Sequence, residues 1–224
     1  MTYQTLSKNR GQKGIEESGV LPAFTNVAVH DCWASYWKYT EATHAICCAH
    51  LLRELTCIAE CSPTHLWPIL FYDLLLDMKQ IVTKKAEQGK QAVSRYFQKK
   101  FSDKYRLILT LADRECPPPD VDQDGKHRGK RGKERALIDR LRKYEEEICR
   151  FTRDFRVPFD NNQAERDLRN IKTKIKVSGC FRTDTGCSDY LGIMSYLSTG
   201  RKHNVNPLDA LSAALSGSPD IVLS

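Results

Sequence analysis

Apolar residues recur at helical spacing through the middle of this 224-residue chain. In two successive runs the apolar positions lie mostly three or four residues apart, which places them on one face of a helix. The first run is Leu66, Leu70, Leu74 and Ile81, and the second is Val93, Phe97, Phe101, Tyr105, Ile108 and Ala112. The letters "EQGKQ" between the runs are typical of a turn. The pattern therefore predicts an antiparallel pair of helices.

A third apolar seam predicts one long helix that begins at Glu134. Its positions alternate spacings of four and three residues, as expected for a helix face that packs on a neighbour. These positions are Leu137, Leu141, Tyr144, Ile148, Phe151 and Phe155. We expect Pro158 to end this helix, because proline has no backbone N–H to donate.

The stretch "PFDNNQAERDLR", residues 158–169, predicts the start of the next helix, with Asn162 as its N-cap. The expected buried stripe of this helix is Ala164, Leu168 and Ile171. A further helix after the loop "SGCFRTDTG" is marked by Tyr190, Ile193, Met194 and Leu197. In the final segment, "NPLDALSAALSG", Asn206 is the expected N-cap and Gly217 follows the end of the helix.

Residues 1–56 differ from the rest, because short apolar runs of strand type alternate with helical segments. The strand candidates are "TYQTL" (residues 2–6) and "NVAVHD" (residues 26–31), and "RGQKGIEESG" (residues 10–19) predicts a brief helix between them. The segment "HAICCAHLLREL" (residues 44–55) passes from a short apolar run into a helix. The predicted fold class is therefore α/β, mostly α by residue count, with a helical C-terminus.

The positive charge of the chain is moderate but unevenly distributed. The net charge is +7, and residues 125–136 and 169–176 hold much of the excess. Such stretches suit a phosphate-rich partner, although a solvated linker would look similar in the first of them. No run of about eighteen apolar residues predicts a membrane span. The start of the chain lacks the apolar core of a secretion signal, and its nine Cys contain no pair of C-x-x-C units, so we expect a cytoplasmic protein with reduced thiols.

Two acids lie at the ends of predicted elements. Asp31 follows the strand "NVAVH", so its side chain should project from the carboxyl end of a strand, where α/β sheets place ligand groups. Glu165 falls in the first turn of a predicted helix, and carboxylates that converge on one site bind Mg²⁺. Each acid also has a simpler interpretation. Asp31 could cap a helix that begins at Cys32, and Glu165 could form a capping box with Asn162.

Basic residues beside Glu165 favour the metal-site interpretation over the helix cap. Arg166, Arg169 and Lys172 follow it on the same helix, and a phosphodiester substrate needs cationic neighbours. Glu165 and Arg169 are also correctly spaced for an ordinary i,i+4 ion pair. Both interpretations are open at the level of spacing alone.

Four stretches of the chain resemble the insertion sequence sixty-six family of bacterial transposases: "VAVHDCWASYWKY", "HAICCAHLLREL", "RVPFDNNQAERDLRNIKTKIKVSGCFRT" and "SYLSTGRKHNVNPLDAL". The similarity runs in order from about Lys8 to Leu215. It implies an RNase H-like core with an Asp-Asp-Glu triad, interrupted by a helical insertion. It also implies that Asp31 is the second Asp and Glu165 the Glu, both catalytic ligands of Mg²⁺ or Mn²⁺. Glu165 is then a metal ligand that also begins its helix.

The resemblance further implies a division of the chain into three segments. Residues 1–56 would be a partial RNase H-like core with its late strands, residues 57–133 the helical insertion and a basic linker, and residues 134–224 the return to the core with the C-terminal helices. The implied reaction is metal-dependent DNA cleavage and strand transfer in DNA transposition. The implied partners are transposon ends and target DNA, together with a second copy or an intact transposase, and no membrane. The residues expected to bind DNA are Arg166, Arg169, Lys172, Lys174, Lys176 and Arg182.

The chain departs from the family pattern at the first Asp of the triad. Before Asp31 the only acids are Glu16 and Glu17, both in the predicted helix after Gly14. Because "TYQTL" resembles the third strand of the fold, we expect an N-terminally truncated, incomplete core that is inactive alone, since two carboxylates cannot hold both metal ions as three do. The alternative is a catalytically inactive nucleic-acid-binding or transposase-interacting protein. In a third interpretation, the missing carboxylate is replaced by Asp73, Asp160 or Asp167.

A C-x-x-H unit, Cys47 and His50, resembles a motif that several transposase families place after the second Asp. One Cys and one His do not make a zinc site, so we expect a structural role beside the active centre. His30 is expected to be a strand residue near the site rather than a base. The aromatic residues that follow Asp31 are expected in the core rather than as a base-stacking platform: Trp33, Tyr36 and Trp37.

Overall fold

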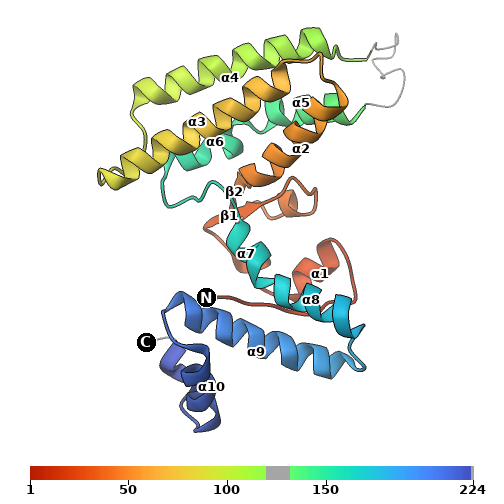
Figure 1. Cartoon of the computed structure of the whole chain (residues 1–224), viewed down its shortest axis with the longest axis vertical. Coiled ribbons are helices and arrows are strands. Elements are labelled where there is room, and N and C mark those ends of the chain that lie inside the picture. The colour runs from red at the N-terminus through yellow and green to blue at the C-terminus, as the bar shows by residue number, and fades with distance from the viewer. Residues whose placement is uncertain (120–131, 223–224) are drawn as a thin grey trace. The chain divides into compact units, whose positions relative to one another are not determined.

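The computed structural model describes residues 1–119 and 132–222, with the side chain of Ile221 left out. The described chain is mostly helical, with one sheet of two short strands (Figure 1). It forms two compact units. Residues 25–161 make up the central unit, and residues 1–24 with 162–224 make up the terminal unit. Most of the predicted basic linker lies outside the described residues, and the three-part division by family architecture stays a prediction.

The predicted strand at residues 26–31 is confirmed and begins the central unit. It forms β1 (Val27–His30), which pairs in parallel with β2 (Thr43–Ile46). The register places Val27 opposite Thr43 and His30 opposite Ile46. A single 3₁₀ turn at Tyr36–Lys38 lies in the connection, and α2 (Cys48–Cys61) follows β2 almost directly, as the apolar-to-helical pattern predicts.

The predicted antiparallel helix pair is confirmed as α3 (Trp67–Glu87) and α4 (Arg95–Glu115), which lie side by side (Figure 1). Gly89 in the turn between them has a φ of 72°, a left-handed conformation that glycine adopts without strain. The rings of Phe71 and Tyr105 meet edge to face with centroids 4.6 Å apart. The apolar positions that the sequence places on one face are therefore the positions at which the two helices pack.

The prediction of one long helix from Glu134 is wrong, although its apolar seam is correct. The segment forms α5 (Lys133–Lys143) and α6 (Glu145–Arg153), which are separated at Tyr144. Tyr144 leaves the helical conformation with φ −114° and ψ 30°, and its ring stacks on Trp37 with centroids 4.2 Å apart. The seam residues Leu137, Leu141, Ile148 and Phe151 are all buried.

Helix α6 also ends before the predicted terminator Pro158. Its last residue is Arg153, and Phe155 donates its N–H to the carbonyl of Gln91 instead of continuing the helical ladder. The N–H of Val93 in turn donates to the carbonyl of Thr152. A backbone partner from the α3–α4 turn therefore ends the helix before the proline does.

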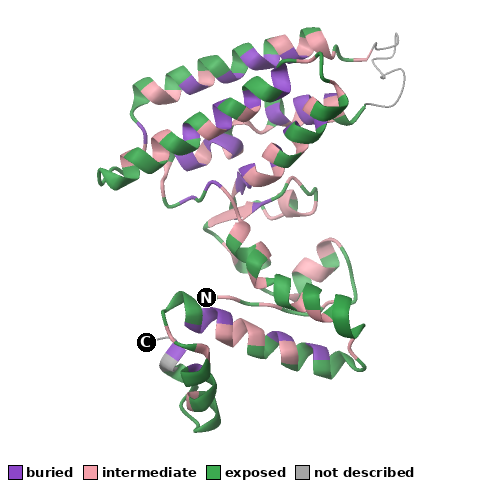
Figure 2. Cartoon of the chain, viewed as in Figure 1, coloured by how far each residue is buried: buried purple, intermediate pink, exposed green. Residues whose placement is uncertain are grey.

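The buried apolar side chains of the central unit form one cluster between the helices α2 to α6. Figure 2 shows these buried residues in purple on the facing sides of the helices. One charged residue lies among them. Arg135 is buried, and its guanidinium donates to Asp113 and Asp139 at 2.8 Å. Burial alone would lower the pKa of Arg135, but the two carboxylates raise it above its ordinary value. The buried cation is thus compensated, as a low-dielectric interior requires.

The terminal unit begins with an extended segment, and the predicted strand at residues 2–6 is wrong. The N–H of Thr2 donates to the hydroxyl of Thr199 and the N–H of Gln4 to the hydroxyl of Ser195, each at 2.9 Å. A strand needs backbone partners, whereas this segment finds side-chain hydroxyls on a helix. The brief helix that follows is confirmed as α1 (Gln12–Glu17), and a 3₁₀ turn occupies Leu21–Ala23.

The rest of the terminal unit is helical. It consists of α7 (Asn162–Asp167), α8 (Arg169–Ser178), α9 (Asp184–Lys202), α10 (Pro207–Leu215) and a final 3₁₀ turn at Pro219–Val222. Helix α9 begins inside the predicted loop, because the Thr183 hydroxyl accepts the N–H of Gly186 at 3.0 Å and caps it. The predicted cap of α10 is confirmed, since Asn206 Oδ1 accepts the N–H of Leu208 at 2.8 Å.

The predicted buried stripe of the helix after Pro158 is wrong. Neither α7 nor α8 contains a buried residue, and Ala164 and Leu168 are exposed, while Ile171 is half-buried. The helical period reports which residues share a face, but it does not report whether another element covers that face. Within the described chain, no helix is both long and apolar enough to span a bilayer. All nine Cys are described and carry free thiols.

Candidate catalytic acids and their surroundings

Asp31 lies directly after β1 and its side chain is exposed to solvent. Its Oδ1 accepts the backbone N–H of Trp33 at 3.0 Å, which closes a local turn. The alternative role as cap of a helix from Cys32 is wrong, because the next helical turn begins only at Tyr36. Its Oδ2 has no hydrogen bond to another residue in the described part of the chain. The turn thus orients a carboxylate that keeps one oxygen open.

His30 holds the backbone at the same point. Its imidazole is buried, its Nδ1 contacts the carbonyl oxygen of Asp31, and its Nε2 lies 2.9 Å from His44 Nδ1. Its ring stacks on Tyr36 with centroids 4.6 Å apart. Burial lowers the pKa of His30 below its ordinary value, which favours the neutral ring. His30 is therefore a buried strand residue that supports the position of Asp31.

The aromatic residues after Asp31 divide between core and surface. Trp37 packs against the core and stacks on Tyr144, as expected, and Tyr36 is half-buried. The core prediction for Trp33 is wrong, because 46% of this residue is exposed. Its backbone, rather than its ring, serves the site by donating to the carboxylate of Asp31.

Cys47 of the C-x-x-H unit is fully buried and has a hydrogen-bonding role. Its Sγ accepts the backbone N–H of Asn161 at 3.2 Å. The side-chain amide of Asn161 donates to the carbonyl of Val29 at 3.2 Å, and the N–H of Cys48 donates to the carbonyl of Phe159 at 3.0 Å. The residues just before α7 are therefore attached to β1 and to the start of α2. The sequence interpretation missed this role of Asn161, because its partners Cys47 and Val29 are more than a hundred residues away in the chain.

Glu165 lies in the first turn of α7 and is half-buried. It belongs to the terminal unit, whereas Asp31 belongs to the central unit. The basic residues predicted to bind DNA follow on α7, α8 and the loop after them. Of these, Lys174 is half-buried, and its Nζ lies 4.8 Å from the centroid of the Phe181 ring. The exposed members are Arg166, Arg169, Lys172, Lys176 and Arg182.

These exposed cations are not neutralised within the described chain, where none of the five forms an ion pair. The alternative of an i,i+4 pair between Glu165 and Arg169 is accordingly not realised. Positive side chains without a partner keep their full attraction for a phosphate backbone. The basic character of α8 is thus available to an external anion.

The model of the transposase IS66 family matches residues 1–189 of the chain. The chain belongs to this family. The matched range includes Asp31, Glu165 and every basic residue predicted to bind DNA. No curated protein and no solved structure matches the chain. Membership in the IS66 family assigns a transposase type of function, with DNA as the partner that this type implies.

In this IS66-family chain, a hollow of about 400 Å³ extends the basic surface of the terminal unit. The hollow is lined by residues of α7, α8 and α9: Gln163, Arg166, Asp167, Asn170, Met194, Ser198, Arg201 and Lys202. Arg201 is exposed and was missed by the sequence interpretation, although the letters "GRKH" at residues 200–203 carried the signal. Two helices therefore contribute cations to one hollow.

Asp167 is the anionic centre of that hollow. It accepts the hydroxyl of Ser198 at 2.7 Å and the ammonium of Lys202 at 2.9 Å, and the hydroxyl of Thr2 also reaches it at 3.2 Å. Burial alone would raise the pKa of Asp167, but Lys202 and Ser198 hold it below its ordinary value. Asp167 thus binds the N-terminal segment and α9 to α7.

The described residues do not assemble a complete metal site. Within residues 1–119 and 132–222, no three His, Cys, Asp or Glu side chains are grouped so that they could hold a metal ion together. Glu17 accepts hydrogen bonds from Ser7 and Asn9, each at 2.5 Å, and Glu16 accepts one from Gln12 at 2.6 Å. The two acids that precede Asp31 therefore have local structural partners. Among the acids considered as replacements for the missing carboxylate, Asp160 has its Oδ2 3.6 Å from the Nζ of Lys79.

Proposed function

We propose that this chain belongs to a DDE-type transposase, whose chemistry is metal-dependent DNA cleavage and strand transfer, and that it contributes Asp31 and Glu165 as two of the metal-binding carboxylates. The observation that carries the proposal is the family match over residues 1–189, which includes both acids. Carboxylate oxygens are the donors that Mg²⁺ and Mn²⁺ prefer. The geometry of Asp31 supports the assignment, because the residue is exposed and only its Oδ1 is engaged in a hydrogen bond within the described chain.

The parallel pair β1 and β2 supports an RNase H-like core, because Asp31 follows the carboxyl end of β1, where parallel sheets place ligand groups. Helices α3 and α4 would then belong to the insertion that separates the second Asp from the Glu. Asn161 supports the same scheme within the central unit, since its side-chain amide donates to the carbonyl of Val29 on the strand that precedes Asp31.

The chain's own residues have distinct tasks in this proposal. The N–H of Trp33 and the ring of His30 orient Asp31, while Arg166, Arg169 and Lys172 bind and neutralise the DNA backbone. A bound divalent ion would supply activation of the attacking oxygen and stabilisation of the leaving oxygen. Two carboxylates are too few for two ions, and Glu16 and Glu17 are engaged locally, so the proposed reaction requires a third acid in addition to Asp31 and Glu165. The isolated chain should therefore not catalyse strand transfer.

Metal titration of the full chain tests the assignment of the two acids. We expect Asp31→Asn and Glu165→Gln each to weaken Mn²⁺ binding at least about tenfold, as loss of a metal ligand does. The matched control is Asp103→Asn, which removes an exposed acid from α4 and should leave Mn²⁺ affinity unchanged. Equal Mn²⁺ affinity in the wild type and both site variants would refute the role of Asp31 and Glu165.

A cleavage assay on DNA with transposon ends tests the expected inactivity of the chain alone. We expect no strand transfer with Mg²⁺ or Mn²⁺. Turnover that Asp31→Asn abolishes would show instead that the chain holds a complete catalytic site.

A further inference from the structure

The turn end of the α3–α4 pair is the most basic part of the central unit that the structure describes. In residues 84–104, seven side chains are Lys or Arg and two are Asp or Glu. The basic residues are Lys84, Lys85, Lys90, Arg95, Lys99, Lys100 and Lys104. The two basic stretches identified from the sequence lie elsewhere, at residues 125–136 and 169–176. The helix pair therefore carries a separate concentration of positive charge.

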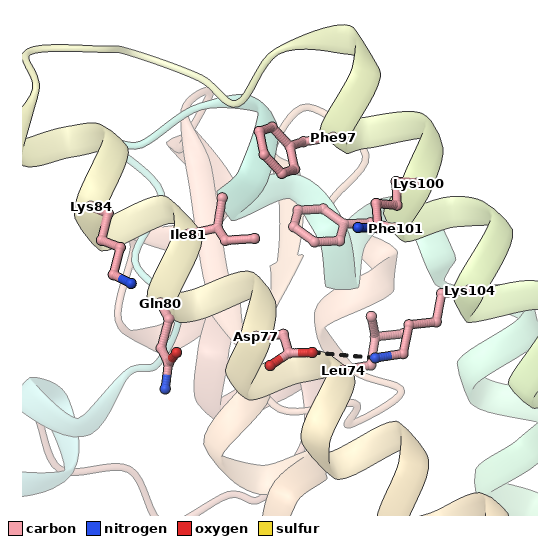
Figure 3. Close-up of a pocket in the computed structure, with 9 residues that line it drawn as sticks. All are labelled: Leu74, Asp77, Gln80, Ile81, Lys84, Phe97, Lys100, Phe101 and Lys104. Carbon is pink, nitrogen blue, oxygen red and sulfur yellow. Dashed lines mark hydrogen bonds and ion pairs between the residues drawn. The ribbon is translucent and has the colours of Figure 1, made fainter.

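A groove of about 240 Å³ lies between α3 and α4 near this end. Its floor is apolar: Leu74 and Phe101 are buried, and Ile81 and Phe97 are half-buried. Figure 3 shows Ile81 and the two phenyl rings pointing toward one another between the helices. The groove thus presents aromatic and aliphatic carbon to a ligand.

Three lysines and one acid surround this floor, and they are not equivalent. Lys104 is neutralised by Asp77, with Nζ 3.2 Å from Oδ2, as the dashed line in Figure 3 marks. Lys84 on α3 and Lys100 on α4 are exposed, and neither forms an ion pair within the described residues. Two uncompensated cations, one from each helix, therefore line the apolar groove.

An exposed aromatic residue lies beside the groove. Tyr96 is 70% exposed, and its ring meets that of Phe97 edge to face with centroids 5.5 Å apart. Protein surfaces that bind nucleic acid commonly combine two kinds of side chain. Cations contact the phosphates, and neighbouring aromatic rings contact the bases or sugars. An acidic peptide would use the cations but would not need the exposed ring.

We propose that this groove, with Lys84, Lys100 and the rings of Tyr96 and Phe97, is a second DNA-binding surface that contacts the phosphodiester backbone independently of α8. The inference rests on the proposed function only in taking DNA as the substrate. It gives the helix pair a role in holding DNA in addition to its role in packing.

Salt-dependent DNA binding by the full chain tests the groove. The probes are a fluorescent duplex of about 30 base pairs and a single strand of the same length, followed by anisotropy at several salt concentrations. We expect Lys84→Gln/Lys100→Gln to weaken binding about tenfold and to reduce the slope of log K against log[salt] by about 2. Lys84→Arg/Lys100→Arg keeps both charges and should bind as the wild type does. Arg114→Gln/Lys143→Gln removes the same charge elsewhere on the central unit and should change neither affinity nor slope.

A parallel variant separates this inference from the proposed function. Lys172→Gln/Lys176→Gln on α8 should weaken DNA binding by a similar factor, and the two effects should combine in the fourfold variant. If the α8 variant loses affinity while the groove variant retains both affinity and salt slope, the groove proposal is overturned and the proposed function stands. If the groove variant keeps DNA binding but loses binding of a polyglutamate peptide, the groove is a protein-binding site. If the wild type binds neither DNA probe at low salt, both proposals fail.

Discussion

The central and terminal units are stabilised in different ways. All of the largest fully buried side chains in the described chain belong to the central unit, among them Trp67, Tyr105 and Phe71. In the terminal unit, α7 and α8 bury no residue, and the buried residues of α9 include Ser198, Thr199 and Gly200. The central unit is therefore held by apolar packing, whereas the terminal unit depends more on hydrogen bonds and ion pairs.

This difference bears on the candidate site. Asp31 is fixed to a packed unit by a turn and a buried imidazole. Glu165 lies on a short helix whose attachment depends on the polar network around Asp167. Polar networks are weakened by small changes in charge or protonation, while a packed core is not. We therefore expect the two units to respond differently to the same kinds of perturbation.

The largest expected effect is in the core of the central unit. Trp67→Ala should lower the free energy of unfolding by about 3–5 kcal/mol, because it empties a fully buried site. It also leaves Glu134 without the indole N–H that lies 2.7 Å from it. Urea unfolding followed by circular dichroism measures the loss. Leu215→Ala, at a residue that is 90% exposed, is the control and should have little effect.

A smaller effect is expected from the polar network of the terminal unit. Asp167→Asn should destabilise this unit by about 1–3 kcal/mol, because Lys202 loses its charged partner. Thiol labelling of the buried Cys187 at increasing urea reports on opening of this unit, and labelling of the buried Cys149 reports on the central unit. We expect Asp167→Asn to accelerate labelling of Cys187 only, and the control Asp189→Asn, an exposed residue on α9, to change neither. Equal acceleration at both thiols would contradict the separation of the units.

The same carboxylate gives the terminal unit a dependence on pH. Because the pKa of Asp167 is lowered in the folded state, its contribution to stability is fully present above the ordinary value of 3.8. It is lost as the pH falls through the lower folded pKa. The stability difference between the wild type and Asp167→Asn should therefore be constant near neutral pH and disappear in strong acid. A difference that grows as the pH falls would show that Asp167 has the opposite role.

The smallest effect is expected where the residues before α7 attach to the strands. Asn161→Ala should cost about 1 kcal/mol, because it removes the hydrogen bond to the carbonyl of Val29. Hydrogen exchange should increase at residues 159–161 and at the end of β1. Asn170→Ala, at an exposed position on α8, is the matched control. Unchanged exchange at the strand would contradict the structural role of Asn161.

Much of the fold follows from local patterns. Periodic apolar positions predict α3 and α4 correctly, and alternation of short apolar runs predicts β1, because a single face or strand carries these signals. Asn206 and Pro207 predict the start of α10, since a helix cap depends only on residues within one turn. The position of Asp31 after β1 was predictable for the same reason.

Other features depend on partners that are distant in sequence. Tyr144 interrupts a periodic seam where its ring stacks on Trp37, and the segment at residues 2–6 finds hydroxyls of α9 in place of a neighbouring strand. The groove cations Lys84 and Lys100 are sixteen positions apart and meet only because α3 and α4 pack as a hairpin.

The sequence by itself determined the helical content, the family of the chain and the identity of the two candidate acids, because motifs and short periodicities are sufficient to recognise them. Only the tertiary structure decided which faces are covered, where α5 and α6 separate, and which cations have a counter-charge. The physical reason is that burial and ion pairing are properties of two surfaces in contact, and a periodic pattern describes only one of them.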